Sequence, residues 1–68
     1  MFTYEKLFIL LKSKGINKNW LRTHGINPKT VDKFVKNEDV KLSTISRVCT
    51  LLNCTPNDIL TYIPDEEE

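Results

Sequence analysis

The stretch "THGINPKTVDKFVKN", Thr23 to Asn37, decides the fold of this 68-residue chain. Gly25 can adopt the positive φ that a tight turn demands and that residues with a Cβ resist. Asn27 is a good helix N-cap, and Pro28 suits the first position of a helix, where its missing N–H is no loss. Two short helices joined by three or four residues that include a glycine form a helix-turn-helix. The stretch therefore predicts that motif, with Ile26 filling the angle between its two helices.

Helical spacing of apolar residues continues before this stretch, and no segment of the chain alternates with the period of a strand. We expect a first helix over residues 4–14, capped by Thr3 and stopped by Gly15. A short second helix should cover residues 18–24, with Asn17 as its N-cap.

The same spacing continues after the stretch. Residues 28–36 should form the third helix, and residues 44–52 the fourth, capped by Ser43 and stopped by Asn53. A fifth helix should cover residues 56–63. Its signals are a cap, a first-turn proline, a capping-box acid and a terminating proline: Thr55, Pro56, Asp58 and Pro64. The expected architecture is an all-α domain of five helices over residues 1–64.

The third helix should have two unlike faces. Val31 and Phe34 lie on one face and would hold the helix to the core. The other face has Pro28 at its start and is otherwise charged, mostly cationic: Lys29, Asp32, Lys33 and Lys36. In a helix-turn-helix, the exposed N-terminal part of the second helix meets base edges in the major groove. The pattern therefore predicts an element that reads double-stranded DNA.

Charge is divided unevenly along the chain, although the formal net charge is +1. Residues 12–47 contain nine basic and three acidic residues, a net charge of +6, whereas the residues after Arg47 carry −5. This asymmetry is typical of a polyanion-binding surface joined to an acidic tail, although a solvated lysine-rich surface explains the basic part equally well. We assign the tail to residues 65–68 and expect it to be mobile.

Several other classes of protein are disfavoured. No apolar run approaches the roughly 20 residues of a membrane helix, and the N-terminus lacks the parts of a secretory signal, so we expect a cytoplasmic protein. A single histidine and the absence of a glycine-rich phosphate loop argue against an enzyme. The two cysteines fit no metal motif; Cys49 should lie in the core, and Cys54 in a loop or half buried. We expect no cofactor, metal or small-molecule ligand.

The order of these elements resembles the Cro and lambda-repressor-like (Xre-type) helix-turn-helix transcriptional regulators, in a small single-domain branch from bacteria and phages. Three segments carry the likeness: "YEKLFILLKSKGI" at residues 4–16, the pattern "LR…GI.P.TV.K..KNE.V" from Leu21 to Val40, and "VCTLLNCTPNDILTYIPDEEE" at residues 48–68. The resemblance implies a five-helix domain that binds operator DNA, usually as a dimer.

The resemblance also implies which residues would touch DNA. The groove-facing residues would be Asn27, Pro28, Lys29, Thr30 and Lys33. The residues near the phosphate backbone would be Lys18, Lys36, Asn37, Lys41 and Ser43. Two positions depart from the family pattern, because Gly25 comes one residue early and Leu21 stands where relatives usually have alanine. Either the second helix is shortened or the helix pair opens slightly.

We therefore expect a sequence-specific DNA-binding regulator, a repressor, that acts as a homodimer. The candidate dimer surface is Leu51 with residues 60–63, although Tyr62 and Ile63 could instead cover the core. Arg22 could touch phosphate or pair with an acid. Trp20 should join the core, and His24 should pack or cap beside the turn. The rival interpretation is an antirepressor-like protein-interaction module that keeps the fold without binding DNA.

Overall fold

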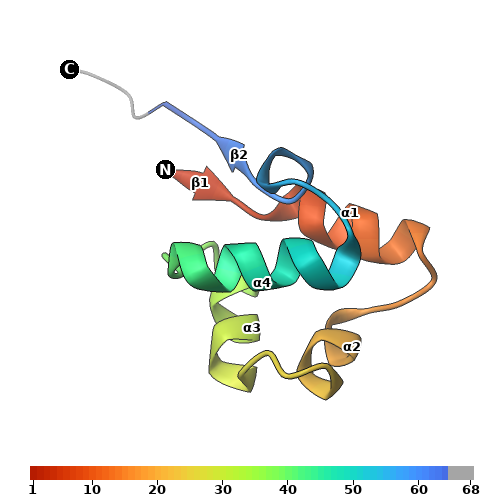
Figure 1. Cartoon of the computed structure of the whole chain (residues 1–68). Coiled ribbons are helices and arrows are strands. Elements are labelled where there is room, and N and C mark those ends of the chain that lie inside the picture. The colour runs from red at the N-terminus through yellow and green to blue at the C-terminus, as the bar shows by residue number, and fades with distance from the viewer. Residues whose placement is uncertain (65–68) are drawn as a thin grey trace.

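The computed structural model describes residues 1–64; the predicted acidic tail, residues 65–68, lies outside the described residues. The described part contains four α-helices, a short 3-10 helix (η1) and a two-stranded sheet (Figure 1). Their bounds are β1 Phe2–Thr3, α1 Glu5–Ser13, α2 Lys18–Thr23, α3 Pro28–Val35, α4 Leu42–Leu52, η1 Pro56–Asp58 and β2 Thr61–Tyr62. In Figure 1, α2 and α3 lie below α4, and the sheet lies above it beside the N-terminus.

The two helices of the predicted helix-turn-helix begin where the local signals placed them. The Asn17 side chain accepts a hydrogen bond from the backbone N–H of Asn19 at 3.0 Å, and α2 starts at the next residue, Lys18. The Asn27 side chain does the same for Lys29 at 2.8 Å, and Pro28 is the first residue of α3. Both asparagines satisfy donors that an α-helix leaves unpaired at its start.

Two of the other predicted N-caps, Thr3 and Ser43, were wrong. Helix α1 is preceded by Tyr4, and Thr3 belongs to β1. Helix α4 already begins at Leu42, so Ser43 lies inside its first turn. The start of α1 is stabilised from far along the chain, because the Tyr4 backbone N–H donates to the side-chain oxygen of Asn37 at 3.0 Å. Local capping patterns carry no information about such a contact.

The predicted fifth α-helix was wrong: the domain is mostly helical, with four α-helices and a small two-stranded sheet in its described part. The predicted capping box is present, since the Thr55 backbone N–H donates to the Asp58 carboxylate at 3.0 Å. Hydrogen bonds from the backbone N–H and the hydroxyl of Thr55 hold the pKa of Asp58 below its usual value. However, the helix stops after one 3-10 turn, and β2 pairs antiparallel with β1, with Tyr62 opposite Phe2. Aromatic and β-branched residues favour a strand there, and β1 supplies the unpaired backbone that the strand needs.

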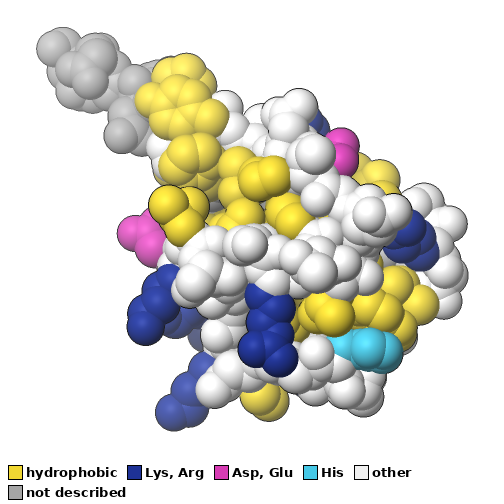
Figure 2. Space-filling view, viewed as in Figure 1, with side chains coloured by type: hydrophobic (Ala, Val, Ile, Leu, Met, Phe, Trp, Pro, Cys, Tyr) yellow, Lys and Arg dark blue, Asp and Glu magenta, His cyan; other side chains and the backbone are white. Residues whose placement is uncertain are grey.

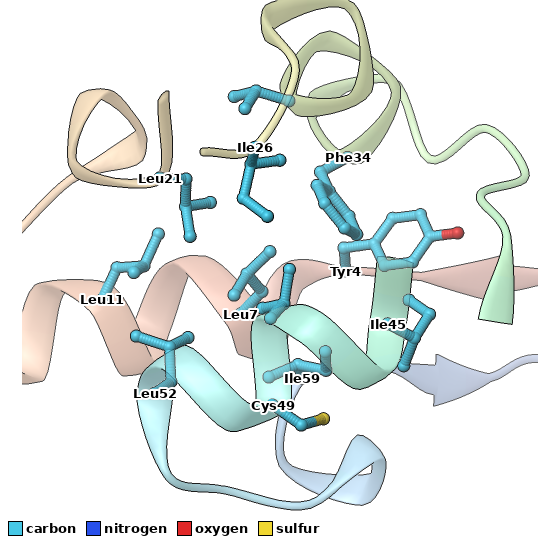
Figure 3. Close-up of a cluster of buried hydrophobic side chains, with 12 residues drawn as sticks. Tyr4, Leu7, Leu11, Leu21, Ile26, Phe34, Ile45, Cys49, Leu52 and Ile59 are labelled. Carbon is cyan, nitrogen blue, oxygen red and sulfur yellow. The ribbon is translucent and has the colours of Figure 1, made fainter. Parts of the chain in front are cut away.

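One hydrophobic core holds the helices together. Buried side chains from all four α-helices, the α2–α3 turn and the residue after η1 point toward one another (Figure 3). Phe34 of α3 is completely buried and meets the ring of Tyr4 edge to face, with the ring centroids 4.8 Å apart. Cys49 is buried and Cys54 half buried, and both thiols are free, as expected. Trp20 is half buried and packs against this core.

Candidate nucleic-acid interface

Helix α3 separates apolar from cationic residues as the sequence predicted. Val31 and Phe34 are both completely buried, so this face of the helix is fixed to the core. Asn27, Pro28, Lys29 and Lys33, all predicted to face the groove, are exposed, and Thr30 is half buried. The fold therefore presents this set from the N-cap to the last turn of a helix whose other face is anchored.

The turn between α2 and α3 is compact. Gly25 has a φ of +97°, and the backbone N–H of Ile26 donates to the Leu21 carbonyl at 3.0 Å. Ile26 is buried between the helices, as predicted. Helix α2 has six residues, in keeping with the shortened-helix alternative for the early glycine, and Leu21 is completely buried in the core.

An ion pair links the two helices of the motif. The Arg22 guanidinium lies 3.7 Å from the Asp32 carboxylate, and it also bonds the Asn19 side chain. Of the two roles left open for Arg22, the structure therefore shows pairing with an acid. An exposed pair of this kind adds little stability. It does place a cation beside Asp32, the acidic residue on the outward face of α3, and so reduces repulsion between that face and a polyanion.

His24 packs and caps beside the turn, as expected. Its ring stacks on that of Trp20 at a centroid distance of 3.8 Å and an interplanar angle of 22°. Its Nδ1 lies 2.8 Å from the Trp20 carbonyl oxygen. The imidazole therefore completes hydrogen bonding at the C-terminal end of α2.

Arg47 also contacts this turn, a contact that was not predicted from the sequence. A Cβ placed on Gly25 would lie 2.7 Å from a terminal guanidinium nitrogen of Arg47, which comes from the middle of α4. The guanidinium therefore lies against the backbone of the turn. No local pattern signals this contact, because 22 positions separate the two residues along the chain.

The predicted phosphate-facing residues lie at the ends of helices. Lys18 is the first residue of α2, Lys36 follows α3, and Lys41 precedes α4. These three lysines and Ser43 are exposed. Figure 2 shows basic side chains projecting from the part of the molecule that holds α3 and the following loop. Two of these lysines therefore lie at the two ends of the loop between α3 and α4, and the third lies at the start of the motif.

Asn37 differs from the other members of this set because its side chain also serves the fold. It has a φ of +58°, and its side-chain oxygen accepts from the Tyr4 backbone N–H. One residue on, the Glu38 carbonyl accepts from the Tyr4 hydroxyl at 2.8 Å. Burial raises the pKa of Tyr4, so the hydroxyl stays protonated and able to donate. The loop after α3 is thus fixed to the start of α1, and the Asn37 amide N–H groups remain available to a phosphate.

Among residues 1–64, no cluster of three or more histidine, cysteine or acidic side chains is arranged to hold a metal ion. None of the helices in the described part is long and apolar enough to cross a membrane.

The two glycines with positive φ should respond differently to alanine. Gly15 has a φ of +74° with open space around its Cβ position, so Gly15→Ala should cost roughly 1–2 kcal/mol of backbone strain. Gly25→Ala should cost more, roughly 2–3 kcal/mol, because its φ of +97° is less accessible and Arg47 must move. Urea unfolding of both variants measures the difference. Adding Arg47→Ala should recover the part due to Arg47; equal losses at the two glycines would contradict this account.

Comparisons with known proteins agree on one family. The family model of the Cro/C1-type helix-turn-helix DNA-binding domain matches residues 6–65. The solved structure entitled "Crystal structure of transcriptional regulator VanUg, Form II" superimposes with a TM-score of 0.88 at 35% sequence identity. The match covers 94% of this chain and 87% of that one. No curated protein matches the chain significantly.

Proposed function

We propose that this chain, which belongs to the Cro/C1-type helix-turn-helix DNA-binding domain family, is a transcriptional regulator that reads a specific double-stranded operator. The observation that carries the proposal is the division of α3 into a completely buried apolar face and an exposed cationic one. A helix held in this way can enter the major groove without disturbing the core. Its solved structural relative is also titled a transcriptional regulator.

Base reading is assigned to the N-cap Asn27 and to four residues of α3: Pro28, Lys29, Thr30 and Lys33. Lysine side chains can donate to the O6 and N7 atoms of guanine, and the amide of Asn27 can pair with adenine. Thr30 can donate to or accept from a base edge or contact a thymine methyl. Pro28 adds apolar contact and keeps the start of the helix rigid.

Register on the duplex is assigned to Lys18, Lys36, Asn37, Lys41 and Ser43. Their side chains are exposed at the borders of α2, α3 and α4, on both sides of the reading helix in the sequence. Contacts to phosphate set the position of a protein on DNA but carry no sequence information. Each phosphate that a lysine neutralises releases counterions, so binding should weaken steeply as salt is added.

The regulator is proposed to act as a repressor in the cytoplasm and as a homodimer. Occupancy of an operator that overlaps a promoter is enough to exclude the polymerase. One short reading helix covers few base pairs, so two copies on a palindrome would supply the specificity that a genome requires. Tyr62 and Ile63, part of the expected dimer surface, are exposed rather than covering the core. Residues 65–68 add four negative charges that should lower non-specific DNA affinity.

Selection of bound sequences from a random duplex library tests this function directly. We expect an enriched palindromic motif, together with retention on heparin at low salt that is lost at high salt. Retention without an enriched motif would contradict sequence reading and leave a general basic surface. No retention on duplex DNA or heparin at any salt concentration would favour the antirepressor-like interaction module instead.

A further inference from the structure

An apolar groove lies along α4, with further walls from β1, the α3–α4 loop and residues 54–60. It has a volume of about 620 Å³. Most of the side chains that line it are apolar, among them Phe2, Val40, Leu42, Ile45 and Leu60. Figure 2 shows apolar side chains gathered between the sheet and α4. No local pattern in the sequence indicates this groove, because its walls come from both ends of the chain and from the middle.

The rim of the groove carries apolar side chains that are exposed to solvent in the monomer. Leu42, the first residue of α4, is 83% exposed, the highest value among the exposed large apolar side chains of residues 1–64. Phe2, which also lines the groove, is exposed as well, and the ring of Tyr62 packs against its ring at a tilt of 57°, with the ring centroids 5.4 Å apart. A contiguous apolar patch of this kind on a small domain marks an interaction site.

We infer that a second copy of this chain docks on the groove, with Leu42 of each copy inserted into the groove of the other. In an isologous dimer the same patch faces itself across a two-fold axis. The patch here offers both parts that such an arrangement needs, a projecting leucine and an apolar groove beside it. The inference rests on the proposed function in that it identifies the surface through which the DNA-binding homodimer forms.

The charged residues at the rim of the groove are complementary to those of a second copy of the chain. Asp39 is the charged residue among those that line the groove, and Lys41 stands directly before the projecting Leu42. When Leu42 of one copy enters the groove of the other, the adjoining Lys41 is brought to a rim that carries the partner's Asp39. The two-fold axis would form this pair of opposite charges twice. Matched charges at the edge of an apolar contact set its register and disfavour other partners.

The position of the groove also fits a partner that binds DNA. Asp39, Val40 and Leu42 form part of its wall. The proposed phosphate-contacting residues lie next to them in the sequence: Lys36, Asn37, Lys41 and Ser43. An occupant of the groove would therefore sit next to the same DNA. A second copy brings its own basic surface to that place, whereas a partner without one would meet the phosphates unfavourably.

Leu42→Asp is the main test of this interface. The leucine is exposed in the single chain, and an aspartate at the first position of a helix is favourable, so the variant should fold normally. In the dimer the carboxylate would be buried in an apolar groove, so self-association should weaken at least about tenfold. Ile9→Asp on α1 is the matched control, because Ile9 is 62% exposed and does not line the groove. Sedimentation over a range of concentrations without DNA measures both variants.

A charge exchange tests the orientation of the two copies. Asp39→Lys alone and Lys41→Asp alone should each weaken the dimer, because each places like charges together twice across the axis. The double variant should restore self-association toward that of the parent chain. A double variant as weak as the single ones would overturn this pairing of residues.

Cys54 gives an independent readout from inside the groove, which its half-buried side chain helps to line. Burial and the neighbouring Cys49 raise the pKa of its thiol to about 11, so labelling is best followed at alkaline pH. The labelling rate of the parent chain should fall as protein concentration rises, and that of Leu42→Asp should not. Equal labelling of the two proteins at all concentrations would place the self-association elsewhere.

The outcomes separate this inference from the proposed function. A chain that stays monomeric with and without DNA, yet binds duplex DNA, would overturn the interface and leave DNA binding intact. A dimer broken by Leu42→Asp in a protein that binds no DNA would support the interface and overturn the DNA function. Dimers equally sensitive to Ile9→Asp, or occupancy of the groove by an apolar small molecule without self-association, would overturn the inference.

Discussion

Replacing Lys29 or Lys33 with alanine should weaken binding to the selected operator by roughly 1–3 kcal/mol, or about 5- to 150-fold. Both side chains are exposed on α3, and they lie four residues apart, so they face the same side of the helix. If each donates to a base edge, its loss should also relax base choice at one position of the site. Anisotropy titrations on the selected operator and on its single-base variants measure both effects.

Lys18→Ala is the control that separates recognition of bases from non-specific attraction to phosphate. Lys18 is the first residue of α2 and is assigned to phosphate, so its loss should weaken binding to all sequences alike. It should also flatten the dependence of log K on log salt by about 0.9. None of the three substitutions should change stability, because the side chains are exposed. If all three lower affinity by one factor on operator and random DNA, α3 is a basic surface and reads no sequence.

Phe34→Ala should unfold most of the protein at room temperature. Phe34 is completely buried, and its replacement by alanine should cost about 3–5 kcal/mol through lost burial and the cavity left behind. A domain of this size rarely has more than about 3–5 kcal/mol from its core. The ring is also the contact through which α3 meets Tyr4, so DNA binding should disappear together with the fold. Circular dichroism during urea titration measures the loss.

The neighbouring residue provides the control for this second prediction. Val35 is 47% exposed at the end of α3, so Val35→Ala should change stability by no more than about 0.5 kcal/mol. Phe34→Leu keeps most of the apolar volume, so its loss of stability should lie between those of Val35→Ala and Phe34→Ala. A Phe34→Ala protein with the parent's unfolding midpoint would show that α3 is held by other contacts.

The sequence predicted the helix-turn-helix well because its signals are local. Asn17 and Asn27 cap the helices that directly follow them, and Gly25 takes its positive φ within the turn itself. Burial of Val31 and Phe34 follows from their spacing on a helix. The exposure of the residues assigned to DNA could be predicted in the same way; their contacts with DNA stay predictions.

The errors and omissions lie where distant segments meet. The start of α1 depends on Asn37, and the strand that replaces the expected fifth helix depends on β1 at the other end of the chain. Strands of two residues are too short to show alternation. Arg47 at Gly25 and the groove beside α4 likewise arise only once the helices have packed. Periodicity and capping rules use only residues that are close in the sequence, so they cannot predict such contacts.

The pairing of β1 with β2 has a consequence for how the molecule folds and opens. It brings together residues 62 positions apart, since the Met1 amino group donates to the Ile63 carbonyl at 2.8 Å. Closing so long a loop costs chain entropy that the local helical contacts do not incur, so the pairing should form after the helices have assembled. The hydrogen bonds between β1 and β2 should also be the first to open in native-state hydrogen exchange. The wall of the groove that β1 forms would then open and close while α3 stays in place.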